Sequence, residues 1–283
     1  MTTVLVIGAA GAVGRLATAA LLERGVEVVE PEHRPGPAAD ARALRAAAEG
    51  CGAVLLLAPP APGGVAAQNA VVDAAADVGA RLVQVSSFGP AVREDSPVPG
   101  ARRDWITHRY LMRRGLPYTL VRPDPLMQSL IGDHAADVRE RGLLADPVGG
   151  RAIGMVDARD VAEVVVRVLT EPGHEGRTYR LGSGAETSYR EIAALLSGLT
   201  DRPVQCRELS PGEVASWLEP RRGGEAQALD GAALFALLRA GAYGPAGDED
   251  VVRIAHRAPR GVEEFLKDHL HHFMPAATTG EVS

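Results

Sequence analysis

Asp104 and His108 are the residues whose types and spacing point most directly to acid–base chemistry. The stretch from Asp104 to Arg114 has a helical pattern, and residues four apart share one helix face, so the two side chains are predicted to touch. A carboxylate that orients and charges an imidazole creates a general acid or base that works near neutral pH. The alternative is an ordinary surface pair among neighbouring arginines. Trp105 either offers a stacking surface or packs the helix.

Three spaced glycines near the N-terminus predict a phosphate-binding loop. Gly8, Gly11 and Gly14 follow the apolar run from Val4 to Ile7 and precede a helical pattern from Arg15 to Arg24. Such glycines turn the chain, let a pyrophosphate approach the backbone, and let the helix pack on the strand. The free amides and dipole at the helix start favour an anion. The predicted cofactor contacts are Gly8, Ala10, Gly11, Ala12, Val13 and Gly14; the alternative is a tight turn without a ligand.

The end of the second strand, predicted over Val26 to Val29, would meet the adenosine ribose of a dinucleotide. An acid there hydrogen-bonds the ribose hydroxyls of NAD, whereas a basic group accommodates the extra phosphate of NADP. The chain offers two glutamates but also His33 and Arg34, which favour NADP because the guanidinium could pair with a phosphate. A solvated charged turn is the alternative. Ala58 and Pro59 end the next buried strand, where a loop on the nicotinamide side is expected.

Composition excludes several function classes. The 283 residues carry a formal charge of −6 and no lysine-rich tail, so we expect no nucleic-acid partner. No run approaches the ~18 apolar residues of a spanning helix, which predicts neither export nor a membrane partner. Cys51 and Cys206 are widely separated in the sequence, so we expect both to be free thiols that pack in the interior of a cytoplasmic protein. His269, His271 and His272 lack further ligands nearby, so no metal site is expected.

Alternating apolar runs and helical patterns predict an α/β fold with a Rossmann-like, doubly wound parallel sheet. Residues 1–150, together with about 151–182, form the expected dinucleotide-binding domain. Residues 183–274 form a smaller, helix-rich C-terminal lobe that contributes the substrate cleft, and residues 275–283 form a disordered tail.

Local signals mark several helix starts. Asp160 is predicted to be the N-cap of a helix that runs to Thr170. Ser188 with Glu191, and Ser210 with Glu213, have the spacing of capping boxes.

Six segments carry a family resemblance: GAAGAVGRL (8–16), LLLAPPAP (55–62), NAVVDAAADVGARLVQVSSFG (69–89), RGLPYTLVRPDPLMQSL (114–130), VDARDVAEVVVRVLTEPGHEGRTYRLG (156–182) and TSYREIAALLSGLTDRPVQ (187–205). In their order and spacing, the chain resembles the NmrA-like branch of the atypical short-chain dehydrogenase/reductases over nearly its full length. The resemblance implies an NAD(P) site at the glycine loop and a substrate cleft between the two lobes. Members of this branch act as quinone or isoflavone-type reductases, or as redox sensors.

The resemblance also implies roles for residues in the cleft. Ser86 and Ser87 leave a strand where short-chain reductases place a hydroxyl that hydrogen-bonds a substrate carbonyl; satisfied turn hydroxyls are the alternative. Phe88, Met127 and Gln128 are predicted to line the cleft as an apolar wall with one amide, which suits a flat organic substrate.

The chain departs from the family pattern in three ways. It has no tyrosine and lysine four residues apart, because Lys267 is its only lysine. Asp104 and His108 stand where the branch often has a lysine or histidine followed by a glutamate. Roughly fifteen residues, about one helix and strand, are missing after the second strand, so the third edge strand is predicted to be shortened or absent and the adenine pocket truncated.

Three functions follow as hypotheses. The first is an NAD(P)H-dependent oxidoreductase that reduces a carbonyl or quinone of an aromatic small molecule, with secondary metabolism as its expected setting. Here Ser86 or Ser87 would polarise the oxygen and His108, oriented by Asp104, would supply the proton. The second is a cofactor-independent isomerase, cyclase or dehydratase that uses the same acid–base pair. The third is a non-catalytic NAD(P)-sensing regulator. A homodimer is compatible with each.

Overall fold

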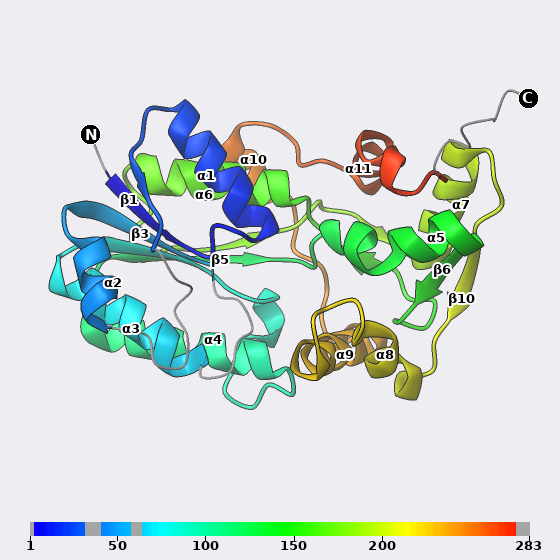
Figure 1. The fold of residues 1–283 in the computed structure, drawn as a ribbon, viewed down its shortest axis with the longest axis horizontal. Helices are drawn as coiled ribbons and strands as arrows, with labels where there is room; N and C mark the ends of the chain where they lie inside the picture. The colour runs from blue at the N-terminus through cyan, green and yellow to red at the C-terminus, as the bar shows by residue number, and fades with distance from the viewer. Residues whose placement is uncertain (1–2, 32–40, 58–63, 276–283) are drawn as a thin grey trace, which may run out of the picture.

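The computed structural model describes residues 3–31, 41–57 and 64–275, and a parallel sheet lies at its centre (Figure 1). The described part of the sheet has six strands in the order β2-β1-β3-β4-β5-β8, and each neighbouring pair is parallel. The strands are β1 (Thr3–Ile7), β2 (Val28–Val29), β3 (Cys51–Leu57), β4 (Arg81–Val85), β5 (Tyr118–Pro123) and β8 (Thr178–Leu181). The predicted Rossmann-like fold class is confirmed.

On the side of β2, the sheet ends one strand earlier than in the usual doubly wound order. A sheet of order 3-2-1-4-5-6 has a further strand outside its second one. Here β2 pairs only with β1 among the described residues, and β3 takes the place next to β1 on the other side. The predicted loss of the third edge strand is therefore confirmed for the part of the chain that the structure describes.

Both faces of the sheet are buried under helices. Val4 and Val6 of β1 point into one core layer, and Leu5 and Ile7 point into the other, which explains the uninterrupted apolar run. The helices on the first face are α1 (Ala12–Glu23), α6 (Ala158–Thr170) and α10 (Glu249–Ala255). Those on the second face are α2 (Ala41–Ala48), α3 (Gly64–Asp77) and α4 (Pro99–Arg114) (Figure 1).

The C-terminal lobe has its own apolar core and lies beyond the carboxyl end of the sheet (Figure 1). Its helices are α5 (Ala135–Arg141), α7 (Tyr189–Thr200), α8 (Pro211–Leu218), α9 (Glu225–Ala240) and α11 (Val262–Asp268). Two short strand pairs complete it: β6 (Leu143–Asp146) with β10 (Gln205–Glu208), and β7 (Ile153–Gly154) with β9 (Glu186–Thr187). Both predicted capping boxes are formed. No helix in the described ranges is long and apolar enough to cross a membrane.

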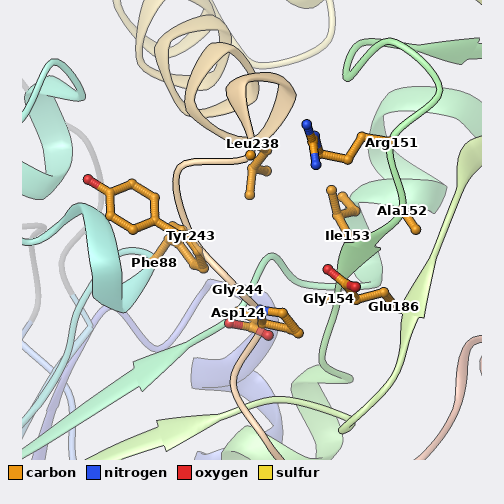
Figure 2. Close-up of a pocket in the computed structure, with 12 residues that line it drawn as sticks. Phe88, Asp124, Arg151, Ala152, Ile153, Gly154, Glu186, Leu238, Tyr243 and Gly244 are labelled. Atoms are coloured by element: carbon orange, nitrogen blue, oxygen red, sulfur yellow. The ribbon is translucent and has the colours of Figure 1, made fainter.

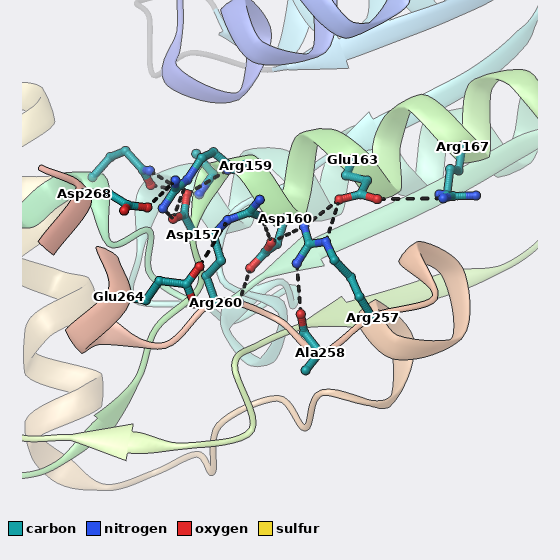
Figure 3. A network of polar contacts seen from close by, with 12 residues as sticks. Asp157, Arg159, Asp160, Glu163, Arg167, Arg257, Ala258, Arg260, Glu264 and Asp268 are labelled. Carbon is teal, nitrogen blue, oxygen red and sulfur yellow. Dashed lines mark hydrogen bonds and ion pairs between the residues drawn. The ribbon is translucent and has the colours of Figure 1, made fainter. Parts of the chain in front are cut away.

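Helix α6 begins differently from the prediction. Its N-cap is Asp157, whose carboxylate accepts a hydrogen bond from the Arg159 amide, so the prediction of Asp160 as the cap is wrong. Asp160 lies in the first turn with a fully buried side chain, and it forms ion pairs with Arg257 and Arg260 (Figure 3). These ion pairs attach the segment between α10 and α11 to α6.

Candidate active site

The main cleft is a pocket of about 530 Å³ at the carboxyl ends of the central strands. Cofactors bind at this end of open parallel sheets, and the volume lies within the range of ligand pockets. The glycine loop after β1, the Ser86–Phe88 loop after β4 and the residues after β5 form its walls, and Arg222 and Leu234 of the C-terminal lobe close it. From the glycine loop, the lining residues are Gly8, Ala10, Gly11, Ala12, Val13 and Gly14.

Each of the three positions in the loop requires or tolerates glycine for a different structural reason. Gly8 has φ +93°, and a Cβ atom there would lie 2.3 Å from the Leu57 carbonyl oxygen. A Cβ on Gly14 would lie 2.3 Å from the Gly8 oxygen, whereas at Gly11 the nearest neighbour would be 3.4 Å away. Gly8 and Gly14 thus permit the turn and the close helix packing, and Gly11 leaves the wall of the cleft free of a side chain.

The start of α1 suits a phosphate group. Gly11 is the N-cap and supplies no side chain that could accept from the first helical amides. These amides carry the positive end of the helix dipole and lie in the wall of the main cleft. The chain's own residues therefore fit the pyrophosphate of a dinucleotide.

Asp104 holds the Ser86–Phe88 loop in place. Its side chain is 3% exposed and accepts hydrogen bonds from the Ser87 amide at 2.6 Å and from Gln68 Nε2 at 3.4 Å. Burial raises the pKa of this carboxyl group, and the hydrogen bonds from Ser87 oppose that rise. Both serines line the main cleft, so Asp104 sets the backbone from which their hydroxyl groups project.

His108 has other partners than the predicted one. Its Nδ1 lies 3.3 Å from Arg122 Nη2, and its ring meets Tyr118 edge-on at 5.9 Å. Burial lowers the pKa of His108, and Arg122 and Arg109 lower it further. Because a guanidinium only donates, Nδ1 is the unprotonated nitrogen of a neutral ring.

In the described chain, no hydrogen bond or ion pair joins Asp104 to His108, contrary to the prediction. Asp104 is buried against the Ser87 loop, while Arg122 at the end of β5 occupies the polar side of the histidine. His108 is also absent from the lining of the main cleft.

Three residues predicted near the substrate lie elsewhere. Met127 is fully buried in the core of the C-terminal lobe. Gln128 donates to Asp157 Oδ1 and accepts from the Ala158 amide, each at 2.9 Å, so it supports the start of α6. Neither lines the main cleft, so their predicted place is wrong. Trp105 packs against the same core as Met127. Of its two predicted roles, a stacking surface or helix packing, the structure therefore shows packing. Phe88 does line the cleft.

Four predicted cofactor contacts, His33, Arg34, Ala58 and Pro59, lie outside the described residues. The predicted disordered tail falls there too, apart from Pro275. In the ranges that the structure describes, no group of three or more histidine, cysteine or acidic residues could hold a metal ion.

Sequence reasoning missed Asp124, which directly follows β5 and lines the main cleft. It also lines a second cavity of about 190 Å³, which we call the side pocket; Phe88, Tyr243, Leu238 and Arg151 contribute to its wall (Figure 2). The available signal was its place, because an acid immediately after a buried parallel strand stands at the ligand-binding edge of the sheet. Arg222 and Leu234 carried no such signal, since only the tertiary fold brings them to the cleft.

A doubly wound sheet with a bare glycine loop at its ligand-binding edge defines a nucleotide-binding protein of the Rossmann class. The family model described as NAD(P)H-binding matches residues 8–172. The chain belongs to this family. The predicted NAD(P) cofactor is therefore confirmed, and the NmrA-like resemblance holds for the fold, which NmrA shares with TM-score 0.75 at 15% identity.

Known proteins resemble the chain in sequence and in structure. An NAD(P)H azoreductase of Xenophilus azovorans is 34% identical over 64% of this chain, and the match spans 61% of the azoreductase. A (4-alkanoyl-5-oxo-2,5-dihydrofuran-3-yl)methyl phosphate reductase of Streptomyces griseus is 34% identical over 73% of this chain and 77% of its own length. The NADPH complex of a quinone oxidoreductase from Escherichia coli has the same fold, with TM-score 0.79, 21% identity, and 95% and 100% coverage of the two chains.

Proposed function

We propose that this protein is an NAD(P)H-dependent oxidoreductase that reduces a carbonyl or quinone group of an aromatic small molecule. The observation that carries the proposal is the main cleft, which brings the glycine loop and the Ser86–Phe88 loop to one pocket. Membership of the NAD(P)H-binding family supports NAD(P)H as the cofactor. The azoreductase and the furan-type phosphate reductase support a small unsaturated substrate.

Some residues of the chain bind the cofactor, and others orient the substrate oxygen. The α1 amides and the bare backbone at Gly11 hold the pyrophosphate. When bound, NAD(P)H supplies the hydride. Ser86 or Ser87 donates a hydrogen bond to the substrate oxygen, which stabilises the negative charge that develops there. Asp104 keeps this loop in position through the Ser87 amide.

Titration with NADPH and NADH, followed by protein fluorescence, tests the proposal. We expect saturable binding, and NADPH oxidation when menadione or benzaldehyde is added. Gly11→Val should abolish binding without unfolding the chain, since Gly11 has ordinary φ and room for a Cβ. Gly198→Ala, at an open helical position, is the matched control and should bind normally. Absence of binding at millimolar cofactor would contradict the proposal.

The cofactor-independent isomerase, cyclase or dehydratase keeps in its favour the third strand missing from the described part of the sheet but loses its acid–base pair, because Asp104 and His108 bind other partners. No contact in the described residues favours a non-catalytic NAD(P)-sensing regulator over an enzyme. We therefore keep the reductase.

A further inference from the structure

Asp124 is held in one position between the main cleft and the side pocket (Figure 2). The residue is 3% exposed, and its Oδ2 accepts a hydrogen bond from the Ala246 amide at 2.9 Å. Two glycines make room for this oxygen: a Cβ would lie 2.6 Å from it at Gly154 and 2.9 Å at Gly182. The carboxyl group is therefore enclosed on its protein sides and reaches ligand space through the two cavities.

The surroundings of Asp124 make its carboxyl group easier to protonate than an ordinary aspartic acid. Burial raises its pKa to about 6, and Glu186 contributes in the same direction. The Ala246 amide and Arg180 oppose the rise, and Arg151 lines the same side pocket. An acid with a pKa near the working pH is well matched to proton transfer.

The side pocket has room for one aromatic ring, and its wall combines aromatic and aliphatic side chains with three charged ones. Its volume is about 190 Å³, and a cavity of about 150 Å³ is known to hold benzene. Phe88 and Tyr243 meet edge-to-face with ring centroids 6.1 Å apart, and Leu238 and Ile153 add aliphatic surface. A third ring could pack against this pair in the usual offset or edge-on geometry.

We propose that the side pocket binds the ring of a one-ring aromatic carbonyl compound and that Asp124 protonates its carbonyl oxygen. This inference rests on the proposed reductase function. The carboxyl O–H first donates a hydrogen bond to the carbonyl oxygen. Once the carbonyl carbon has received the hydride, the electron pair of the former C=O π bond lies on the oxygen. The O–H bond of Asp124 then breaks and the alcohol O–H bond forms. After the alcohol has left, the carboxylate regains a proton from water that enters the side pocket, where Glu186 is exposed.

A binding experiment without cofactor separates this role from turnover. Acetophenone serves as the probe, measured by ligand-detected NMR at pH 5 and pH 8 with the full-length protein. Wild type should bind it about fivefold more tightly at pH 5, the contribution of one hydrogen bond. Asp124→Asn should bind equally at both pH values, because an amide donates at either, and Asp124→Ala should bind weakly at both.

Kinetics with NADPH and benzaldehyde supply the second measurement. The kcat of wild type should fall as pH rises above about 6, where Asp124 loses its proton. Asp124→Asn should lower kcat by roughly 10²-fold and lose that pH dependence. Asp146→Asn is the matched control, since Asp146 is also buried and accepts from two backbone amides but lines neither cavity. Urea unfolding confirms that each variant is folded.

The two proposals fail in different ways. If wild type neither binds NADPH nor oxidises it with any carbonyl, the reductase function is refuted. If wild type reduces benzaldehyde, but Asp124→Asn keeps its kcat and acetophenone binding ignores pH, the role of Asp124 alone is refuted.

Discussion

Replacing His134 by phenylalanine is expected to reduce the loss of stability in acid. His134 is 1% exposed, and its ring packs at a tilt against Trp217, with ring centroids 4.9 Å apart, and against Tyr189, at 5.3 Å. Within the described part of the chain, neither ring nitrogen has a hydrogen-bond partner. Burial lowers the pKa of His134 to about 4, so the folded protein holds a neutral imidazole at this position.

The size of the effect follows from proton linkage. The folded pKa of about 4 lies below the ordinary value of about 6.5, so between these values the unfolded chain binds a proton that the folded chain excludes. The contribution of this neutral histidine to stability is complete above pH 6.5 and is lost as pH falls toward 4. At pH 4.5 the loss amounts to about 2.5 kcal/mol, since each pKa unit corresponds to ~1.36 kcal/mol.

Urea unfolding at pH 7.5 and pH 4.5 measures this contribution. The drop in unfolding free energy between the two pH values should be about 2.5 kcal/mol smaller in His134→Phe than in wild type. Any constant cost of the larger ring cancels in this difference. His256→Asn, at an exposed histidine with φ +58°, should leave the drop unchanged. Equal drops in wild type and His134→Phe would refute a buried neutral histidine.

Three other changes test the site and its supports. Gly14→Ala should lower the unfolding free energy by about 1–3 kcal/mol in urea, because the new Cβ meets a backbone oxygen; wild-type stability would contradict the packing. Asp160→Asn should cost about 3 kcal/mol by the same assay, since two guanidinium groups lose their buried partner; an unchanged midpoint would argue against the network. Asp104→Ala should lower kcat/KM with menadione by releasing the Ser87 loop, while His108→Gln stays within about twofold of wild type; the reverse order would restore the histidine as the proton donor.

Local sequence rules predicted the elements well because each rule concerns neighbours in the chain. The apolar run of β1, the turn at Gly8 and the capping box at Ser188 depend on a few adjacent residues, and the structure contains all three. The missing strand after β2 was visible as a shortfall in length. Helix α10 was not predicted, because its seven residues show little periodicity outside the fold.

The rules failed where a side chain's hydrogen-bond or ion-pair partner comes from a distant segment of the chain. Asp157 and Asp160 both fit the start of α6, and the distinction comes from Arg257 and Arg260, about a hundred residues later. The spacing of Asp104 and His108 gave their common helix but not the Ser87 amide and Arg122 that hold them. Helical periodicity says which residues share a face, and it does not say what that face meets.

The ion pairs between α6 and the 257–268 segment also bear on how the protein is made (Figure 3). The arginines that neutralise Asp160 follow it in the chain by 97 and 100 residues, and α10, which covers α6, comes just before them. A nascent chain therefore exposes an apolar helix face and an unpaired acid until α10 and the two arginines have been synthesised. A product truncated before Arg257 would keep that defect, and we expect chaperones and proteases to recognise it.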